Sequence, residues 1–338
     1  MVDVIQIPAF KDNYIWLLRK GASAAVVDPG DATPVIEVLR RNEISLVAIL
    51  ITHHHQDHQG GIERLLVEWP DAEVYGPARE SITGLGQPLV GGERLQIESL
   101  DLEFRVIAVP GHTLGHVAFY TRGSLFCGDT LFGGGCGRLF EGTPQAMYES
   151  LMRLAALPDS TLVYCAHEYT EANLRFALAV EPGNRALRHR AEEVAVLRAK
   201  GQSTVPSTLG LEKATNPFLR CEKADVIDAV RAKGIVWTEP ENIFITLLKY
   251  LPRSERGKTL SDGSRYVSAK VSYRVPPGGN TQKYGIADLR SGFHSCNGLP
   301  SIARFHHGET NPQWLAGFHP AGSLSSRKFR CQAIVHVF

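Results

Sequence analysis

A cluster of four histidines and one aspartate directly after an apolar segment constrains this chain more than any other feature. The segment Leu46–Ile51 has the composition of a buried strand, and Thr52-His53-His54-His55-Gln56-Asp57-His58 follows it at once. A turn of this kind at a strand end can aim several side chains into one cleft. Imidazole and carboxylate groups together suit zinc, iron or manganese. The sequence therefore predicts a metal site at this strand end.

Three later motifs disfavour the alternative interpretation, an exposed loop that happens to be rich in histidine. A histidine or an aspartate directly follows a predicted strand in Pro110-Gly111-His112-Thr113, Gly128-Asp129-Thr130 and Ala166-His167. Open α/β folds gather ligands and catalytic groups at the carboxyl ends of their strands. Four separate segments are therefore expected to build one cleft.

Apolar segments in the first half of the chain predict two sheets with helices on their outer faces. Strands are expected within residues 1–28 and at 46–51, 73–75, 104–109, 117–120, 124–127 and 161–165. One helix is expected to begin with Thr33 as its N-cap and Pro34 at its first position, and another to span 144–157. Strands thus occur both in clusters and in alternation with helices, which favours a layered α/β architecture.

The rest of the chain divides into two parts of different character. A catalytic domain over 1–169 is expected to be followed by a smaller helical domain over 170–250, where helix-forming residues recur at helical spacing. Residues 251–338 show little apolar periodicity, so we expect an irregular or disordered extension of unassigned role. Its histidines have no recognisable metal-ligand spacing: His294, His306, His307, His319 and His336.

Charge and cysteine content bear on partners and location. A formal net charge of +1 disfavours a general nucleic-acid binder. The six cysteines form no CxxC pair, and a chain of 338 residues does not need disulfides, so reduced thiols are expected. No basic leader begins the chain, and no apolar run reaches the roughly 18 residues that a membrane span needs. We expect a cytoplasmic monomer with no nucleic-acid or membrane partner.

The four motifs HxHxDH, GHT, GDT and AHE, in this order, resemble the metallo-β-lactamase superfamily over about residues 1–170. The resemblance implies a four-layered αββα fold and two divalent metal ions per chain, with zinc favoured and iron or manganese as alternatives. It assigns His53, His55 and His112 to the first ion, Asp57, His58 and His167 to the second, and Asp129 to a bridging position. Seven ligands are too many for one zinc ion and suit two. His54 and His116 are expected to support the site without binding metal.

A longer set of motifs resembles the glyoxalase II family, the hydroxyacylglutathione hydrolases, over about residues 1–235. It comprises Ile7–Tyr14, Thr52–His55, Gly128–Thr143, Ala166–Thr170 and Asn216–Arg220. The resemblance implies hydrolysis of S-(2-hydroxyacyl)glutathione, such as S-D-lactoylglutathione, to glutathione and D-lactate, as in methylglyoxal degradation. The nucleophile would be a hydroxide that bridges the two ions. Asp57 and Asp129 would be catalytic as the carboxylates that hold these ions.

The expected substrate carries two carboxylates, so its site needs fixed cationic groups. The resemblance assigns contacts with glutathione to Arg138, Tyr169, Arg220 and Lys223. Arginine binds carboxylates in a bidentate manner, and lysine supplies a flexible point charge. The alternative for Arg220 and Lys223 is a solvated helix start, because such side chains are mostly exposed. Phe140 departs from the family pattern, since many members have a tyrosine at that position.

Several alternatives remain open at this point. Asp57 also suits a general base, although its place in the HxHxDH motif favours metal binding. Another hydrolase of the superfamily, such as a lactonase or a β-lactamase-like enzyme, is the main alternative function. A redox protein with two irons would add a flavin-binding domain, and none is recognisable in 251–338. The set of Arg138, Tyr169 and Arg220 favours the glutathione thioester.

Overall fold

The computed structural model describes residues 2–234, 239–250, 267–271 and 285–289. The chain forms two compact units, Met1–Pro252 and Arg253–Phe338. The five histidines of the expected extension, and also Cys296 and Cys331, lie outside the described residues. The four cysteines of the described part are free thiols. None of the helices in these ranges is both long enough and apolar enough to span a bilayer.

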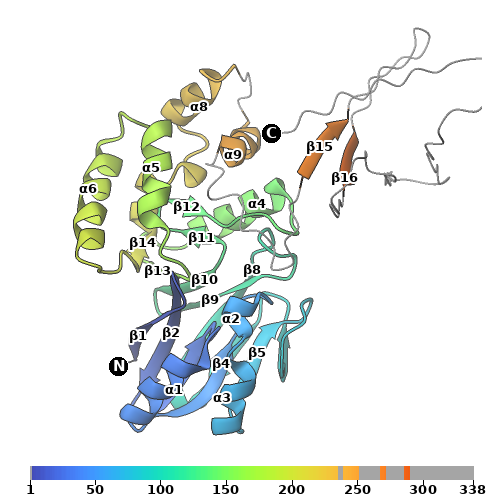
Figure 1. Ribbon diagram of the computed structural model, residues 1–338, viewed down its shortest axis with the longest axis vertical. Helices are drawn as coiled ribbons and strands as arrows, with labels where there is room; N and C mark the ends of the chain where they lie inside the picture. Colours follow the sequence, from blue (N-terminus) through green and yellow to red (C-terminus); the bar gives the residue numbers. More distant parts are fainter. Residues whose placement is uncertain (1, 235–238, 251–266, 272–284, 290–338) are drawn as a thin grey trace, which may run out of the picture. The chain divides into compact units, whose positions relative to one another are not determined.

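The first sheet of the larger unit has six strands in chain order (Figure 1). They are β1 (Asp3–Ala9), β2 (Asn13–Lys20), β3 (Ser23–Val27), β4 (Ser45–Leu50), β5 (Glu73–Pro77) and β6 (Gln87–Leu89). Strands β1 to β3 pair antiparallel, whereas β3 to β6 pair in parallel. The carboxyl ends of β3, β4 and β5 therefore lie along one edge of the sheet.

The second sheet also has six strands, in the order β14-β13-β10-β9-β8-β7. They are β7 (Arg94–Ile97), β8 (Leu102–Ala108), β9 (Val117–Thr121), β10 (Ser124–Gly128), β13 (Leu162–Cys165) and β14 (Ser207–Thr208). The pair β10–β13 is parallel and the other pairs are antiparallel. A short hairpin of β11 (Leu131–Phe132) and β12 (Gly135–Cys136) follows β10.

Alternating side chains of β2 separate two hydrophobic cores. Trp16 and Leu18 belong to the core that also contains Phe104 and Phe119 of the second sheet. Ile15 and Leu17 belong to a core on the other face, which helices α1 (Ala32–Arg41) and α3 (Ile62–Glu68) cover. In a strand that is buried on both faces, successive side chains are apolar and point alternately into the two cores.

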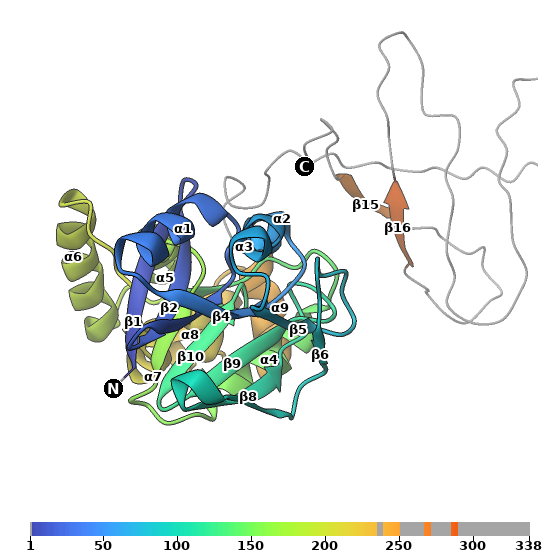
Figure 2. The same cartoon turned by 90° about the horizontal axis from the view of Figure 1, so that it is seen from below.

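The second sheet is covered on its outer side by helix α4 (Pro144–Ala155). Met147, Leu151 and Leu154 of this helix are fully buried in the same core as the sheet's side chains. Figure 2 shows the same layers from below, with the two sheets between helices. The predicted four-layered α/β architecture is therefore confirmed.

The helical segment after β13 packs onto these layers within the same compact unit. Its helices are α5 (Thr170–Val180), α6 (Arg185–Ala199), α7 (Leu209–Thr215), α8 (Ala224–Arg231) and α9 (Pro240–Tyr250). A chain of ring contacts joins Phe176, Phe218 and Phe244 to Tyr148 of α4, with centroids 5.5 to 5.9 Å apart. The division into domains at residue 169 stays a prediction, because the helices and sheets share one core.

The start of helix α1 corrects one expectation. The N-cap is Asp31, whose side chain accepts the N–H of Thr33, so the helix begins at Ala32 instead of after Thr33. Pro34 is thereby the third helical residue. It fits there because the first-turn N–H groups have no partner inside the helix and proline's φ is helical.

In the smaller unit, strands β15 (Val267–Val271) and β16 (Gly285–Leu289) pair antiparallel. Val267 lies opposite Leu289, and Val271 lies opposite Gly285. The sequence predicts no regular element there, so this pair was missed. Each strand has apolar residues at alternating positions, a signal too short to distinguish from chance in a segment of five residues.

We expect a chain that ends at Pro252 to keep the stability of the larger unit. The cut follows α9, whose buried Ile243, Phe244 and Leu247 belong to the main core. The melting temperature should stay within about 3 °C of the full chain, which corresponds to about 1 kcal/mol for a domain of this size. A chain cut before α9, at Gly234, is the contrasting variant and should melt much lower. An equal decrease of the melting temperature in both truncated chains would contradict the expectation.

Candidate metal centre

Close backbone contacts shape the loop that carries the histidine cluster. His53 and His55 precede the short helix α2 (Gln56–Gln59), and Asp57 and His58 lie within it. A Cβ on Gly30 would lie 2.0 Å from the Asp57 carbonyl oxygen, and a Cβ on Gly61 would lie 2.4 Å from the Pro29 carbonyl oxygen. Only glycine fits at both positions, and this lets the turn after β3 pack directly against α2.

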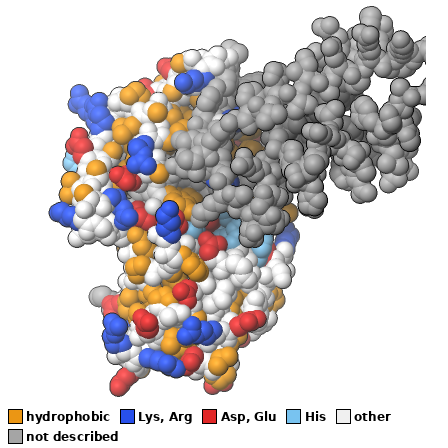
Figure 3. Space-filling model, viewed as in Figure 1, with side chains coloured by type: hydrophobic (Ala, Val, Ile, Leu, Met, Phe, Trp, Pro, Cys, Tyr) orange, Lys and Arg blue, Asp and Glu red, His pale blue; other side chains and the backbone are white. Residues whose placement is uncertain are grey.

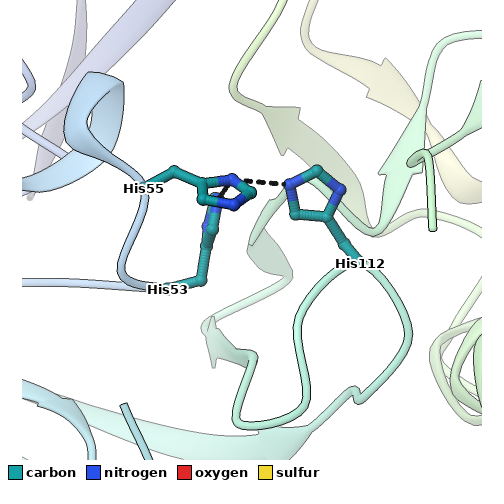
Figure 4. Close-up of side chains that lie close together, drawn as sticks. All are labelled: His53, His55 and His112. Carbon is teal, nitrogen blue, oxygen red and sulfur yellow. Dashed lines mark hydrogen bonds between the residues drawn. The ribbon is translucent and has the colours of Figure 1, made fainter. Parts of the chain in front are cut away.

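Three histidines form the first group of candidate ligands. His55 Nδ1 lies 3.0 Å from His53 Nε2 and 3.0 Å from His112 Nε2. Figure 4 shows His53 and His55 on one loop and His112 approaching from another. Three ring nitrogens from two loops therefore converge on one point. Within the described residues, this set meets the spacing of a metal site.

A second group lies beside the first and shares Asp129 with it. Asp57 Oδ2 lies 3.8 Å from His58 Nε2 and 3.6 Å from His167 Nε2. Asp129 Oδ1 lies 3.5 Å from His58 Nε2 and 3.3 Å from His167 Nε2, while its Oδ2 lies 3.3 Å from His112 Nε2. The two carboxylate oxygens thus face different groups. Figure 3 shows histidine side chains gathered at one place on the surface.

Two buried atoms of the centre test whether the residues fit metal ions. His58 Nε2 and Asp129 Oδ1 are buried and have no hydrogen-bond partner. An unpartnered buried nitrogen and carboxylate oxygen cost free energy unless something else binds them. Imidazole and carboxylate are also the donors that zinc, iron and manganese accept. The donor set therefore fits divalent metal ions.

The other ring nitrogens are held by residues that surround the centre. His58 Nδ1 lies 3.0 Å from Asp28 Oδ2, and His167 Nδ1 lies 3.0 Å from Asp12 Oδ1. His112 Nδ1 donates to the Arg138 carbonyl at 2.7 Å. Such hydrogen bonds fix which nitrogen of each ring faces the metal and increase its basicity.

Three further hydrogen bonds continue this outer layer. Thr52 Oγ1 lies 3.1 Å from His53 Nδ1 and donates to Asp28 Oδ2 at 2.7 Å. Asn13 Nδ2 donates to Asp57 Oδ2 at 3.0 Å. Asp12 and Asn13 lie in the Ile7–Tyr14 motif and Asp28 follows β3, but nothing in their spacing indicates a role at the centre. These residues were therefore missed.

Burial and neighbouring charges set the protonation of the centre. Burial lowers the pKa of His53 well below its usual value and that of His112 to about 4, so both rings are neutral. Burial alone would raise the pKa of Asp129, but His167 and His58 outweigh it and hold that pKa well below its usual value. Burial likewise lowers the pKa of His167, yet Asp129 and Asp12 outweigh it and raise the pKa to about 10. A cation that binds here displaces the proton from His167.

His54 and His116 point elsewhere. His54 Nδ1 lies 3.0 Å from Glu80 Oε2, and its Nε2 lies 3.3 Å from Glu141 Oε1. His116 stacks on His53 with centroids 4.7 Å apart, and both of its nitrogens bond to backbone groups, the Val117 carbonyl and the Asp129 N–H. Neither ring is directed at the candidate metal positions, in line with the supporting role expected for both.

The four expected substrate contacts lie in two different places. The Tyr169 ring stacks on His167, with centroids 4.8 Å apart and an interplanar angle of 3°. Arg138 lies over the Phe140 ring at 5.7 Å, and that ring makes edge contacts with His55 and His112. These residues therefore border the metal centre.

Arg220 and Lys223 lie in the helical segment. Arg220 binds Glu181 in a bidentate manner, with Nε 2.8 Å from Oε2 and Nη2 2.9 Å from Oε1. The Glu181 side chain is fully buried, and that of Arg220 is 16% exposed. Lys223 is exposed and caps α8. The guanidinium of Arg220 is thus committed to an internal carboxylate in this structure.

Family models and known proteins agree on where the chain belongs. Residues 10–167 match the model of the metallo-beta-lactamase superfamily, and residues 168–249 match that of the hydroxyacylglutathione hydrolase C-terminus. The crystal structure of ETHE1 from Myxococcus xanthus shares the fold, with a TM-score of 0.50 at 23% identity over 76% of this chain and 98% of that chain.

Two curated relatives are more similar in sequence. A hydroxyacylglutathione hydrolase of Dechloromonas aromatica is 61% identical over 229 residues, which are 68% of this chain and 85% of that protein. A hydroxyacylglutathione hydrolase of Methylobacillus flagellatus is 53% identical over 247 residues, 73% of this chain and 97% of that protein. The chain therefore belongs to the hydroxyacylglutathione hydrolase family within the metallo-beta-lactamase superfamily.

Proposed function

We infer that this chain is a thioester hydrolase that cleaves S-(2-hydroxyacyl)glutathione to glutathione and a 2-hydroxy acid. S-D-lactoylglutathione, which yields D-lactate, is the representative substrate. The observation that carries this inference is the high identity to curated hydroxyacylglutathione hydrolases over two thirds of the chain or more. The convergence of seven candidate metal ligands agrees with hydrolysis. A lactonase or another hydrolase of the superfamily is less well supported, because the two curated relatives are named as hydrolases of hydroxyacylglutathione, which is a thioester.

We propose that the centre holds two divalent ions, with zinc favoured. The first position would use His53, His55 and His112, the second Asp57, His58 and His167, and Asp129 would bridge them. Two such ions, when bound, lower the pKa of a water toward about 7 and polarise the thioester carbonyl. A thiolate leaves readily, so no strong general acid is required from the chain.

The chain's own residues prepare the centre for this reaction. Asp129 stays ionised at neutral pH because the surrounding imidazoles hold its pKa low, so its two oxygens can serve both positions. Asp57 accepts a hydrogen bond from Asn13, which fixes its carboxylate toward His58 and His167. This orientation favours metal binding by Asp57 over the role of a general base. The neutral rings of His53 and His112 need no deprotonation before they bind metal.

The substrate is proposed to lie across Arg138 and Tyr169. Arg138 is the cation beside the first group, and Tyr169 presents a hydroxyl beside the second, stacked on His167. Phe140 is 56% exposed and lies between Arg138 and the histidines, so it offers an apolar edge where a tyrosine would offer a hydroxyl. Arg220 and Lys223 remain proposed contacts for the glutathione carboxylates. For Arg220, this role requires that N–H groups of its guanidinium remain available to the substrate while others bind Glu181.

The purified chain is expected to hold up to two zinc, iron or manganese ions, and Asp129→Ala should lose at least one. Asp129 faces both groups, so its loss should lower activity by more than the roughly 10- to 100-fold typical of outer-layer residues. Elemental analysis and thioester hydrolysis measure both effects. Asp159→Ala is the matched control, because that aspartate is exposed and pairs only with Lys213. A metal-free wild type that stays inactive after reconstitution would refute the metal assignment.

Replacement of Arg138 by alanine should mainly raise KM for the thioester. A charge-assisted hydrogen bond contributes about 1.5–3 kcal/mol, so KM should rise roughly tenfold or more, discounted for partial exposure. Arg122→Ala is the control, since its guanidinium pairs with exposed Asp101. Steady-state kinetics on S-lactoylglutathione and on a lactone separate substrate recognition from general damage. Unchanged KM in both Arg138→Ala and Arg220→Ala would remove the basis for the assigned contacts.

Arg220→Ala should also destabilise the chain, because it leaves the buried Glu181 carboxylate without its partner. Breaking a buried pair costs about 3–5 kcal/mol, far more than loss of an exposed pair. Chemical denaturation measures the change in free energy of unfolding. The double variant Arg220→Ala, Glu181→Ala should recover part of it, since no unpaired charge remains. If the single variant is as stable as wild type, the pair has no structural role and Arg220 is available for substrate.

A further inference from the structure

Glu80 joins the two loops that carry the first group of candidate ligands. It follows β5 in a turn closed by its own N–H and the Pro77 carbonyl. Its side chain is only 3% exposed and has no lysine or arginine partner in the hydrogen bonds and ion pairs of the described residues. A buried carboxylate without a cation is costly unless several donors bind it. The donors that bind Glu80 identify its role.

Each oxygen of Glu80 serves a different loop. Oε2 accepts the His54 N–H at 2.6 Å and lies 3.0 Å from His54 Nδ1. Oε1 accepts the Thr113 hydroxyl at 2.5 Å and the Gly115 N–H at 2.8 Å. One carboxylate therefore holds the loop of His53 and His55 against the loop of His112.

Neighbouring residues strengthen this connection. Gln59 donates to the His54 carbonyl and to the Ser81 carbonyl, and accepts the Thr83 N–H. Glu80 thus fixes the peptide group before His54, and Gln59, which is itself bound to Ser81 and Thr83 after β5, fixes the one behind it. Gly115 permits the approach, since a Cβ there would lie 2.6 Å from Glu80 Cγ.

Within the described residues, the hydrogen bonds of Glu80 itself reach only residues next to the first ligand group. His54 stands between His53 and His55, and Thr113 follows His112, so all three ligands of the first group adjoin a residue bound to Glu80. The second group is oriented differently: Asp28 holds His58, Asp12 holds His167 and Asn13 holds Asp57. Loss of Glu80 should therefore loosen the first group and spare the second.

We propose that Glu80 is a positioning residue that sets the metal affinity of the His53, His55 and His112 position selectively. The proposal rests on the metal assignment of the proposed function. Glu80 binds no metal itself, because each of its oxygens already has two hydrogen-bond partners, which leaves no lone pair for a cation. The cluster of His54, Glu80 and Glu141 is accordingly a structural connection between loops and does not form a third metal site.

The test is stepwise cobalt(II) binding to the full chain and to Glu80→Gln and Glu80→Ala. Competition with a chelator measures the affinity of each position, and the ligand-field absorption of cobalt reports the geometry at each. His55→Ala and His167→Ala identify which spectrum belongs to which position. We expect the first position to bind at least tenfold more weakly in Glu80→Ala with altered absorption bands, and the second position to change less than threefold. Glu80→Gln should lie between wild type and Glu80→Ala, because the amide keeps one acceptor.

Matched controls separate positioning from general damage. Glu181→Gln removes another fully buried carboxylate in the helical segment, so it should lower stability and leave both cobalt affinities unchanged. Gly115→Ala displaces Glu80 without removing it and should weaken the first position in the same selective way. Gly183→Ala is its control, since a Cβ there meets nothing within 4 Å. If Glu80→Ala does not fold, Gly115→Ala still decides the question.

Each remaining outcome has one meaning. A wild type that binds no cobalt contradicts the proposed metal assignment, and the role of Glu80 is then overturned with it. The wild type could instead bind two ions while Glu80→Ala and Gly115→Ala leave both cobalt affinities unchanged or weaken them equally. That result overturns the role of Glu80 alone. Loss of a third cobalt equivalent in Glu80→Gln would show that Glu80 is a ligand, which also overturns positioning.

Discussion

The buried carboxylate of Asp129 is the constraint on which the rest of this centre depends. An ionised carboxylate in a buried position is stable only if positive charge or hydrogen-bond donors surround it. The imidazoles of His58, His112 and His167 meet this need in part, yet Asp129 Oδ1 and His58 Nε2 remain without hydrogen-bond partners. Bound cations would partner both atoms, so metal binding would stabilise the loops that carry them.

Several candidate ligands are oriented by parts of the chain remote from them. Asp28 follows β3 and holds His58 of α2, while Asp12 precedes β2 and holds His167, which follows β13 of the other sheet. The Asp28–His58 bond joins two loops at one edge of the first sheet, and the Asp12–His167 bond joins the two sheets. The layered fold is thus the means by which seven side chains from four loops reach one place with defined ring orientations.

Local patterns made the candidate ligands and the sheets recognisable in the sequence, whereas the outer layer depends on distant contacts. The histidine cluster, His112, Asp129 and His167 each follow an apolar strand, so neighbouring residues indicate their position. Glu80 and Thr113 are 33 residues apart in the sequence, and Arg220 and Glu181 are 39 apart. No local sequence pattern predicts either contact. The start of α1 at Asp31 was misplaced for a related reason, since Thr33 and Asp31 are both good caps and only the backbone geometry selects one.

The described residues of the helical segment supply no candidate metal ligand, yet they determine the shape of the loop between Asp129 and Arg138. Asn173 Nδ2 donates to the Gly133 carbonyl, Asn216 Nδ2 donates to the Gly135 carbonyl, and Glu212 accepts the Gly134 N–H. Glu212 is itself bound to the buried Arg190. Three side chains thus fix three successive glycines in the hairpin of β11 and β12. Because glycines cannot hold a loop by their own side chains, helices that follow in the sequence help to set the distance from the Asp129 carboxylate to the proposed substrate contact.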